Sequence, residues 1–150
     1  METIDRNNIE IEENQEVKIM LEQWKVYVQM ANNISERRWK SNTFFTTINA
    51  TIISVCASNF VDINKNLVSI IGILISLAWF SSIRSYKMLN SAKFSIINKI
   101  EGNLPIQGFR EEWDKLKSEK YFKLTTNEYY VPIIFIFIYI VYLYSNGAFI

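Results

Sequence analysis

The stretch NLVSIIGILISLAWFSSI, residues Asn66 to Ile83, decides the fold because it is apolar and carries no charged side chain. Two further stretches lack charge, Ser41 to Val61 and Tyr129 to Ile150. A helix that crosses a hydrocarbon core needs about 20 mostly apolar residues, and a charge at its centre costs about 2.5–3.5 kcal/mol. The sequence therefore predicts an all-α membrane protein with three transmembrane helices.

Helical spacing of apolar residues organises the remainder of the chain. Apolar side chains recur at this spacing from Val17 to Ile34, and no Gly or Pro precedes Gly72, so the first helix is expected to run unbroken into the first span. The short connector Asp62 to Asn66 predicts an antiparallel hairpin. The expected segments are a cytoplasmic amphipathic helix (1–40), a transmembrane helical hairpin (41–83), a long cytoplasmic helical segment (84–128) and a C-terminal transmembrane helix (129–150).

Local signals place the ends of the remaining helices. The apolar stripe of the second span continues past Ile83, so that helix is expected to end at Glu101, where Gly102 and Pro105 follow. A short helix is expected around Phe109 to Leu116. Thr125-Thr126-Asn127-Glu128 has the pattern of a capping box that opens the third span.

Basic residues beside the spans predict the topology. Arg37, Arg38 and Lys40 precede the first span, and Arg84 and Lys87 follow the second. The positive-inside rule places Met1 to Lys40 and Arg84 to Glu128 in the cytoplasm, and the hairpin tip and Ile150 outside. We therefore expect a multi-pass protein of the bacterial cytoplasmic (inner) membrane, with a cytoplasmic N-terminus and the lipid bilayer as a partner.

Signatures of catalysis are missing from the sequence. The chain of 150 residues has no His and one Cys, and it contains no Gly-rich phosphate loop. Cys56 lies within the first span and is expected to be a small buried apolar residue. We expect no enzyme activity, no catalytic residue, no metal site and no cofactor.

The first span is the most informative stretch for function, because its polar residues fall in two stripes of a helix. One, the hydroxyl stripe, consists of Thr43, Thr47, Thr51, Ser54 and Ser58, and the other of Asn42, Thr46 and Asn49. Such side chains either bond to neighbouring helices and to their own backbone, or line an aqueous path. Three helices cannot enclose a useful pore, so the second alternative requires a homo-oligomer. In the second span, Ser69, Gly72 and Ser76 form a small-residue ridge that predicts close helix packing.

The cations near the cytoplasmic leaflet also have two interpretations. Five of them are candidates for binding an anionic regulator: Arg37, Arg38, Arg84, Lys87 and Lys93. Attraction to anionic lipid contributes about 1 kcal/mol per basic residue near the surface and explains them as membrane anchors. Alternatively, oligomerisation multiplies them into a ring that holds a nucleotide or a short single strand, with nearby aromatic residues as stacking faces.

A set of residues carries a resemblance over about residues 15 to 145. The set is Arg84-Ser85-Tyr86, Leu89-Asn90, Ala92-Lys93-Phe94, Glu101, Leu104-Pro105, Phe109 and Glu112-Trp113, with Trp24 to Tyr27 and Arg37-Arg38 upstream. The chain resembles the RipA-type family of small bacterial octameric membrane proteins. Its layout is similar to the SLATT-type two-helix membrane effectors of anti-phage operons, including the channel subunits of Hailong defence.

The resemblance implies an all-helical homo-oligomer of four to eight subunits in the cytoplasmic membrane. For defence-associated relatives it implies a pore that opens on infection, together with a nucleotidyltransferase-like partner and its nucleotide or single-stranded DNA product. We therefore expect a gated pore that depolarises the membrane in anti-phage defence and is regulated by an anionic ligand at its cytoplasmic collar. The alternative is a non-conducting membrane scaffold in envelope or pH-stress physiology.

Overall fold

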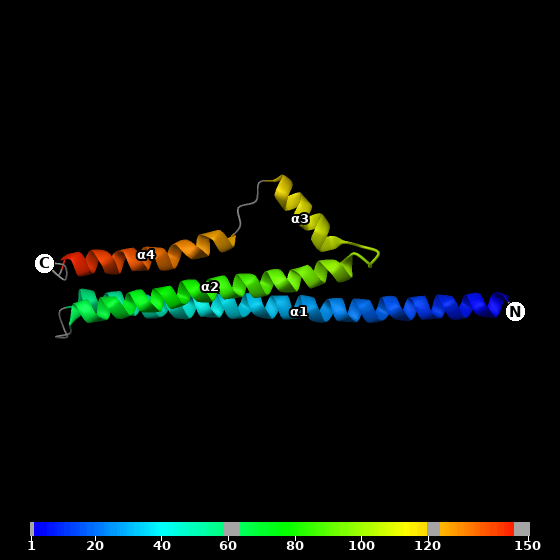
Figure 1. Cartoon of the computed structure of the whole chain (residues 1–150), viewed down its shortest axis with the longest axis horizontal. Coiled ribbons are helices and arrows are strands. Elements are labelled where there is room, and N and C mark those ends of the chain that lie inside the picture. Colours follow the sequence, from blue (N-terminus) through cyan, green and yellow to red (C-terminus); the bar gives the residue numbers. More distant parts are fainter. Residues whose placement is uncertain (1, 59–63, 120–123, 146–150) are drawn as a thin grey trace. The chain divides into compact units, whose positions relative to one another are not determined.

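The computed structural model describes residues 2–58, 64–119 and 124–145, with side chains from residue 12 up to 58, from 64 up to 119 and from 127 up to 145. This part of the chain is helical throughout apart from its connections, which confirms the all-α prediction (Figure 1). The helices are α1 (Glu2–Ala57), α2 (Lys65–Glu101), α3 (Gly108–Ser118) and α4 (Leu124–Ser145). The chain divides into two compact units: unit 1 comprises Met1–Ile34 and Leu89–Tyr121, and unit 2 comprises Ser35–Met88 and Phe122–Ile150.

The two long helices continue from one unit into the other. α1 runs without a break from Glu2 to Ala57, and α2 ends at Glu101, so both expectations are confirmed. Asn64 opens α2, because its side-chain Oδ1 accepts a hydrogen bond from the Leu67 backbone N–H at 3.1 Å. Asp62 and Ile63 of the expected hairpin connector lie outside the described residues.

Two described helices, not three, are long and apolar enough to cross a membrane. They are α2 and residues Asn127–Ser145 of α4. Over the described residues, the prediction of a third span at Ser41 to Val61 is not confirmed by this criterion, and Thr, Ser and Asn side chains recur along that part of α1. Residues 59–61 of this stretch, and 146–150 of the C-terminal one, lie outside the described residues.

Unit 1 is held together by aromatic contacts to α3. The Phe109 ring of α3 lies 5.7 Å from the Trp24 ring of α1 and 5.7 Å, edge to face, from the Phe94 ring of α2. Ala31 of α1 and Ile97 of α2 are buried. Phe109 therefore fixes α3 against both long helices, because aromatic pairs at this separation add to the stabilisation that burial provides.

A buried carboxylate caps α3. Glu101, the last residue of α2, is 2% exposed. Its Oε1 accepts the backbone N–H of Phe109 at 2.9 Å and its Oε2 that of Arg110 at 3.3 Å. A negative charge at a helix N-terminus is favourable because the unpaired N–H groups there carry partial positive charge. The short helix predicted around Phe109 to Leu116 is thus present, slightly longer and anchored by a residue of α2.

Unit 2 has an aromatic and aliphatic core formed by parts of α1, α2 and α4. Trp79 of α2, which is 2% exposed, stacks on Phe45 of α1 at 5.9 Å and contacts Phe135 of α4 at 6.0 Å. Figure 1 shows α4 alongside the other two helices here. α4 begins at Leu124, so the prediction that Thr125 caps it is wrong: Thr125 lies within the helix, and its side chain is outside the described residues.

A polar cluster is buried at the centre of unit 2. Asn49, Ser76 and Tyr139 come from three different helices and are at most 1% exposed. The Asn49 Oδ1 accepts hydrogen bonds from the Ser76 hydroxyl and the Tyr139 hydroxyl, each at 3.0 Å, and its Nδ2 donates to the Phe45 carbonyl oxygen at 2.8 Å. Because a buried amide is unfavourable unless it is bonded, this cluster specifies how the three helices pack.

Gly72 allows α4 to approach α2. A Cβ atom at this position would overlap the Tyr139 ring. Ser69 and Ser76, on the same ridge of α2, are fully buried. The small-residue ridge predicted from the sequence is thus buried, the Tyr139 ring lies against Gly72, and a side chain at Gly72 would displace the tyrosine from Asn49.

We expect Asn49→Ala to lower the free energy of unfolding by about 1–3 kcal/mol, because it removes a buried amide that bonds to Ser76, Tyr139 and the Phe45 carbonyl oxygen. Thermal unfolding in detergent, followed by circular dichroism, measures the change. Thr46→Ala is the matched control on the same helix: Thr46 is exposed and donates only to the Asn42 carbonyl oxygen, so a change within about 0.5 kcal/mol is expected. Equal effects of the two substitutions would contradict the central role of Asn49.

We expect Glu101→Ala to loosen α3, because two backbone N–H groups at its start lose their acceptor. Hydrogen exchange should become faster over residues 108–118 and stay unchanged in α4. Glu101→Gln retains one acceptor oxygen and should have a smaller effect. Glu112→Ala, at an exposed position of the same helix, is the control. Unchanged exchange in the Glu101→Ala protein would show that the Phe109 contacts alone hold α3.

Candidate functional site

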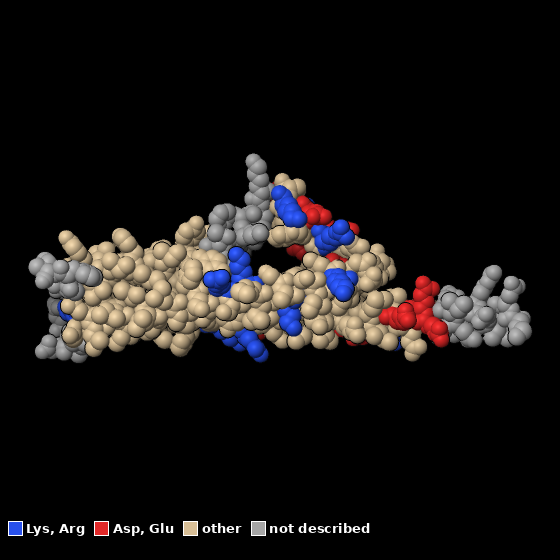
Figure 2. Space-filling model, viewed as in Figure 1, with Lys and Arg blue, Asp and Glu red and all other residues tan. Residues whose placement is uncertain are grey.

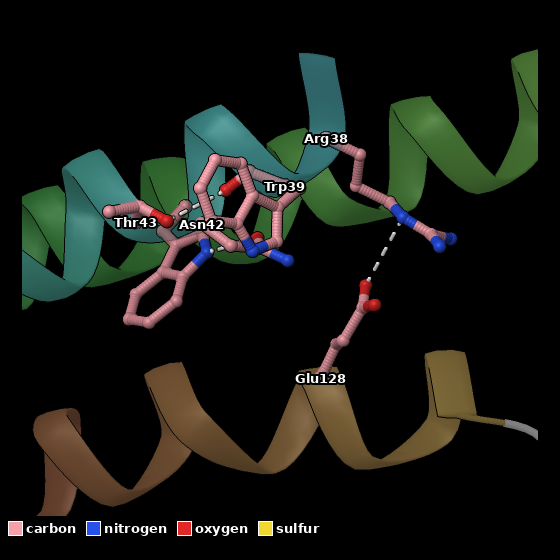
Figure 3. A network of polar contacts seen from close by, with 6 residues as sticks. Arg38, Trp39, Asn42, Thr43 and Glu128 are labelled. Carbon is pink, nitrogen blue, oxygen red and sulfur yellow. Dashed lines mark hydrogen bonds and ion pairs between the residues drawn. The ribbon is translucent and has the colours of Figure 1, made fainter. Parts of the chain in front are cut away.

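The hydroxyl stripe lies on the outer surface of unit 2. Thr43, Thr47, Thr51 and Ser54 are exposed, and Ser58 is half-buried. Each hydroxyl donates to a carbonyl oxygen of the preceding turn at 2.8–3.1 Å, as from Thr51 to the Thr47 oxygen. Figure 3 shows the first of these bonds, from Thr43 to Trp39. A hydroxyl bonded in this way is satisfied without a neighbouring helix, which makes its exposure in an apolar environment less unfavourable.

The second polar stripe behaves differently, because two of its three members bond to neighbouring helices. Asn42 accepts a hydrogen bond from the Trp79 Nε1 at 2.9 Å, and Asn49 is the centre of the buried cluster. Thr46 is exposed and donates to its own helix. Asn42 and Asn49 therefore follow the first alternative, in which polar side chains bond to neighbouring helices. The hydroxyl stripe remains on the surface of the protomer.

The outer surfaces of α2 and α4 are apolar, unlike the part of α1 that carries the hydroxyl stripe. The side chains that α2 exposes between Leu67 and Leu77, and α4 between Val131 and Tyr144, are large and apolar. Figure 2 shows unit 2 as a long surface almost without charge, with cations gathered toward one end. Such a surface suits contact with lipid, and the hydroxyl stripe breaks it along one helix.

Two cations near the end of the apolar surface are exposed: Arg37 on α1 and Arg84 on α2. Lys87 is exposed as well, and its Nζ lies 5.5 Å from the centre of the Tyr129 ring. A cation over an aromatic ring is attracted to the negative face of the ring. Arg37, Arg84 and Lys87 thus belong to unit 2 and have their charged groups at the surface.

Arg38 forms an ion pair that the sequence did not indicate. Its Nε lies 3.5 Å from the Glu128 Oε2 of α4, and the two side chains are 20% and 25% exposed (Figure 3). The pairing joins α1 to α4 beside the apolar core. It also directs the guanidinium of Arg38 toward a carboxylate of the same unit.

Lys93 belongs to unit 1, whereas the other four candidates belong to unit 2. Its Nζ lies 5.2 Å from the centre of the Tyr27 ring and 3.7 Å from the Met30 sulfur. Of the five predicted ligand-binding cations, three are exposed in unit 2 and Arg38 of the same unit pairs with Glu128, whereas Lys93 of unit 1 contacts α1.

One comparison with known proteins identifies the family. The sequence profile of the octameric membrane protein family (8xMP) matches residues 21–147, most of the chain. No curated protein and no solved structure matches it. The matched residues include the hydroxyl stripe, both apolar helices and the described part of unit 1 from Leu21 onward. The chain therefore belongs to the octameric membrane protein family.

Proposed function

We propose that this membrane protein forms a homo-oligomeric gated pore in the bacterial cytoplasmic membrane, in which residues 41–57 of α1 line the conduit. The observation that carries the proposal is the exposed hydroxyl stripe, which interrupts an otherwise apolar outer surface. The proposed topology is that predicted from the flanking cations, with the N-terminus in the cytoplasm.

Packing supports the assignment of α1 to the membrane. Asn49 bonds to Ser76 of α2 and to Tyr139 of α4, and the Cys56 carbonyl oxygen accepts the Tyr142 hydroxyl at 2.6 Å. This part of α1 therefore lies beside both candidate spans over most of its length. A polar helix at that depth is favourable only where protein or water covers its polar side.

A pore must be enclosed on all sides, and several subunits can enclose it where one protomer cannot. Repeating α1 around a ring, as membership of an octameric family allows, would place one hydroxyl stripe per subunit at the axis. Ser and Thr side chains then offer water and ions hydrogen-bonding partners along the path. One stripe per subunit is sufficient, because the second polar stripe is used inside the protomer.

A non-conducting scaffold is the second candidate function, and one observation favours it. All five hydroxyls of the stripe already donate to their own helix. The stripe could therefore pack against a neighbouring subunit without any water-filled path, since Ser and Thr are frequent at helix interfaces in membranes.

The physiological part of the proposal rests on the resemblance to defence effectors. We propose that the pore depolarises the cell in anti-phage defence, that it has no enzyme activity of its own, and that a nucleotidyltransferase-like partner supplies an anionic nucleotide or short single-stranded DNA ligand. The exposed charges of Arg37, Arg84 and Lys87 support an anion site, because oligomeric symmetry would repeat them around the axis.

We expect Thr51→Leu and Ser54→Leu each to reduce the current of the purified oligomer in a planar bilayer to background, because a leucine makes the path apolar. Thr46→Leu is the control, since Thr46 is equally exposed on α1 but lies about 100° around the helix. Unchanged current in an intact oligomer would remove α1 from the conduit. Dissociation of the oligomer in gel filtration would instead show that the stripe is a packing interface, as the scaffold function requires.

We expect the double substitution of Arg84→Gln with Lys87→Gln to weaken binding of short DNA oligonucleotides to the detergent-solubilised oligomer by about tenfold or more, because each charge-assisted contact contributes about 1.5–3 kcal/mol. Lys117→Gln, in α3 of unit 1, should leave binding unchanged. Affinity of the unaltered protein should fall as salt rises. If the affinity for oligonucleotides does not change with salt, or is equal in all variants, these cations serve as membrane anchors and do not bind the ligand.

A further inference from the structure

An open groove in unit 1 lies between α1, α3 and the connection from α2 to α3. Its volume is about 650 Å³, and ligand sites in proteins typically have about 300–1,000 Å³. Most of the side chains along it are apolar or aromatic: Val17, Leu21, Trp24, Leu104, Ile106 and Phe109. All of its lining residues belong to unit 1, so the groove is complete within this unit.

Both helical walls of the groove are held in place by packing. On α1, Val17, Leu21 and Trp24 recur at spacings of four and three residues, so they form one stripe about two helical turns long. On α3, the Phe109 ring contacts the rings of Trp24 and of Phe94 on α2. The groove is therefore a built feature of unit 1, and its α1 wall is as long as about two turns of a bound helix.

The connection from α2 to α3 exposes a large apolar side chain at the groove. Ile106 is 75% exposed. The connection is held at both ends, because the Leu104 backbone N–H donates to the Glu101 carbonyl oxygen at 2.9 Å and the Glu101 side chain caps α3. An apolar side chain presented in this way offers a partner contact area at a small cost in conformational entropy.

The indole of Trp24 leaves one polar group unpaired beside the groove. Trp24 is half-buried, and its Nε1 is shielded from water without a hydrogen-bond acceptor among the described residues. Buried N–H groups are nearly always paired, because an unpaired one is unfavourable. The groove therefore suits an occupant that brings an acceptor oxygen, such as a peptide carbonyl, to the Trp24 ring.

The charge of the groove is negative. Its charged lining residues are Glu101 and Glu112, and among the described residues no lysine or arginine lines it. The Glu101 carboxylate accepts the backbone N–H groups that open α3, whereas Glu112 is exposed and forms no ion pair within the described part of the chain. Lys25, which follows Trp24, pairs with Glu22 at 2.8 Å. A free carboxylate beside an apolar groove favours a cation and repels a phosphate.

We infer that this groove binds a short, basic, amphipathic segment of a partner protein. Apolar side chains of the segment lie against Leu21, Ile106 and Phe109, and a lysine or arginine of the segment pairs with Glu112. A helix whose apolar side chains recur every three or four residues fits a groove of this kind. An anionic nucleotide has neither the apolar side chains nor the positive charge, so the site is distinct in its chemistry from the anion site proposed for unit 2. Neither proposal depends on the other.

Fluorescence anisotropy of a labelled peptide, measured with the detergent-solubilised protein, tests the assignment. The probe is a peptide of about three helical turns, made of Leu, Lys and Ala with the leucines at helical spacing, and titration of empty micelles gives the background. Glu112→Lys should weaken binding by about tenfold or more, because it replaces an ion pair by repulsion. Ile106→Asp should also weaken binding, since it places a charge at the apolar contact.

Matched controls separate the groove from a general attraction to acidic protein. Asp114→Lys makes the same change of charge about 200° around α3 from Glu112 and should leave the affinity within about twofold. Ile19→Asp is the control for Ile106→Asp, since Ile19 is 56% exposed on α1 and does not line the groove. A peptide with glutamate at every lysine position should bind no more than the background. Equal weakening by Asp114→Lys and Glu112→Lys, or equal binding of the two peptides, would overturn the assignment.

Photo-cross-linking locates the peptide on the unaltered protein, so this test needs no variant to fold. A benzophenone side chain replaces the central leucine of the probe, and mass spectrometry identifies the residues to which it attaches. Attachment at Leu21, Trp24 or Ile106 is expected. Attachment confined to the exposed apolar surfaces of α2 and α4 in unit 2 would show that the peptide adsorbs where lipid is expected, and would overturn the assignment. Binding and attachment no greater than with empty micelles would overturn it as well.

Discussion

The amide of Asn49 is the interaction on which unit 2 depends. It accepts two hydroxyl donors from two other helices and donates to its own helix, so all three helices meet at one fully buried side chain. Within a bilayer, apolar side chains have no preference between lipid and protein, and specificity must come from close packing and polar contacts. Gly72 belongs to the same arrangement, because the Tyr139 hydroxyl reaches Asn49 only if the ring can rest on a residue without a side chain. One amide and one glycine therefore specify where α2 and α4 meet α1, together with the contacts of Trp79, Tyr142 and Arg38.

Much of the helical architecture could be predicted from the sequence, because helix continuity depends on local features. The lack of Gly or Pro before Gly72 and the Gly102–Pro105 stop were enough to predict both long helices and the end of α2. The third expected span was not confirmed over the described residues, where polar side chains recur at helical spacing. The start of α4 was wrong for a related reason: a capping-box pattern is short and also occurs within helices.

The candidate site shows where sequence reasoning ends. Periodicity separated the polar residues of α1 into two stripes, but the choice between them depends on which side α2 and α4 occupy. The Arg38–Glu128 pair was missed because its partners are far apart in the sequence and join only when α4 packs beside α1. Glu101 was taken as part of a helix stop, and its capping of α3 requires the chain to turn back after Gly102. Contacts of this kind join residues of different helices, so they can be recognised only once the packing of the helices is known.

The direction of the hydrogen bonds along the hydroxyl stripe has a consequence for ion preference. A Ser or Thr hydroxyl has one hydrogen and two lone pairs. All five hydroxyl oxygens lie within hydrogen-bond distance of a carbonyl oxygen of the same helix, and a hydroxyl that donates there leaves its lone pairs for the surroundings. A surface of this kind offers electron pairs and no free O–H hydrogens. In the proposed conduit, hydroxyls that kept these bonds would present oxygen lone pairs to the path, which suit cations better than anions.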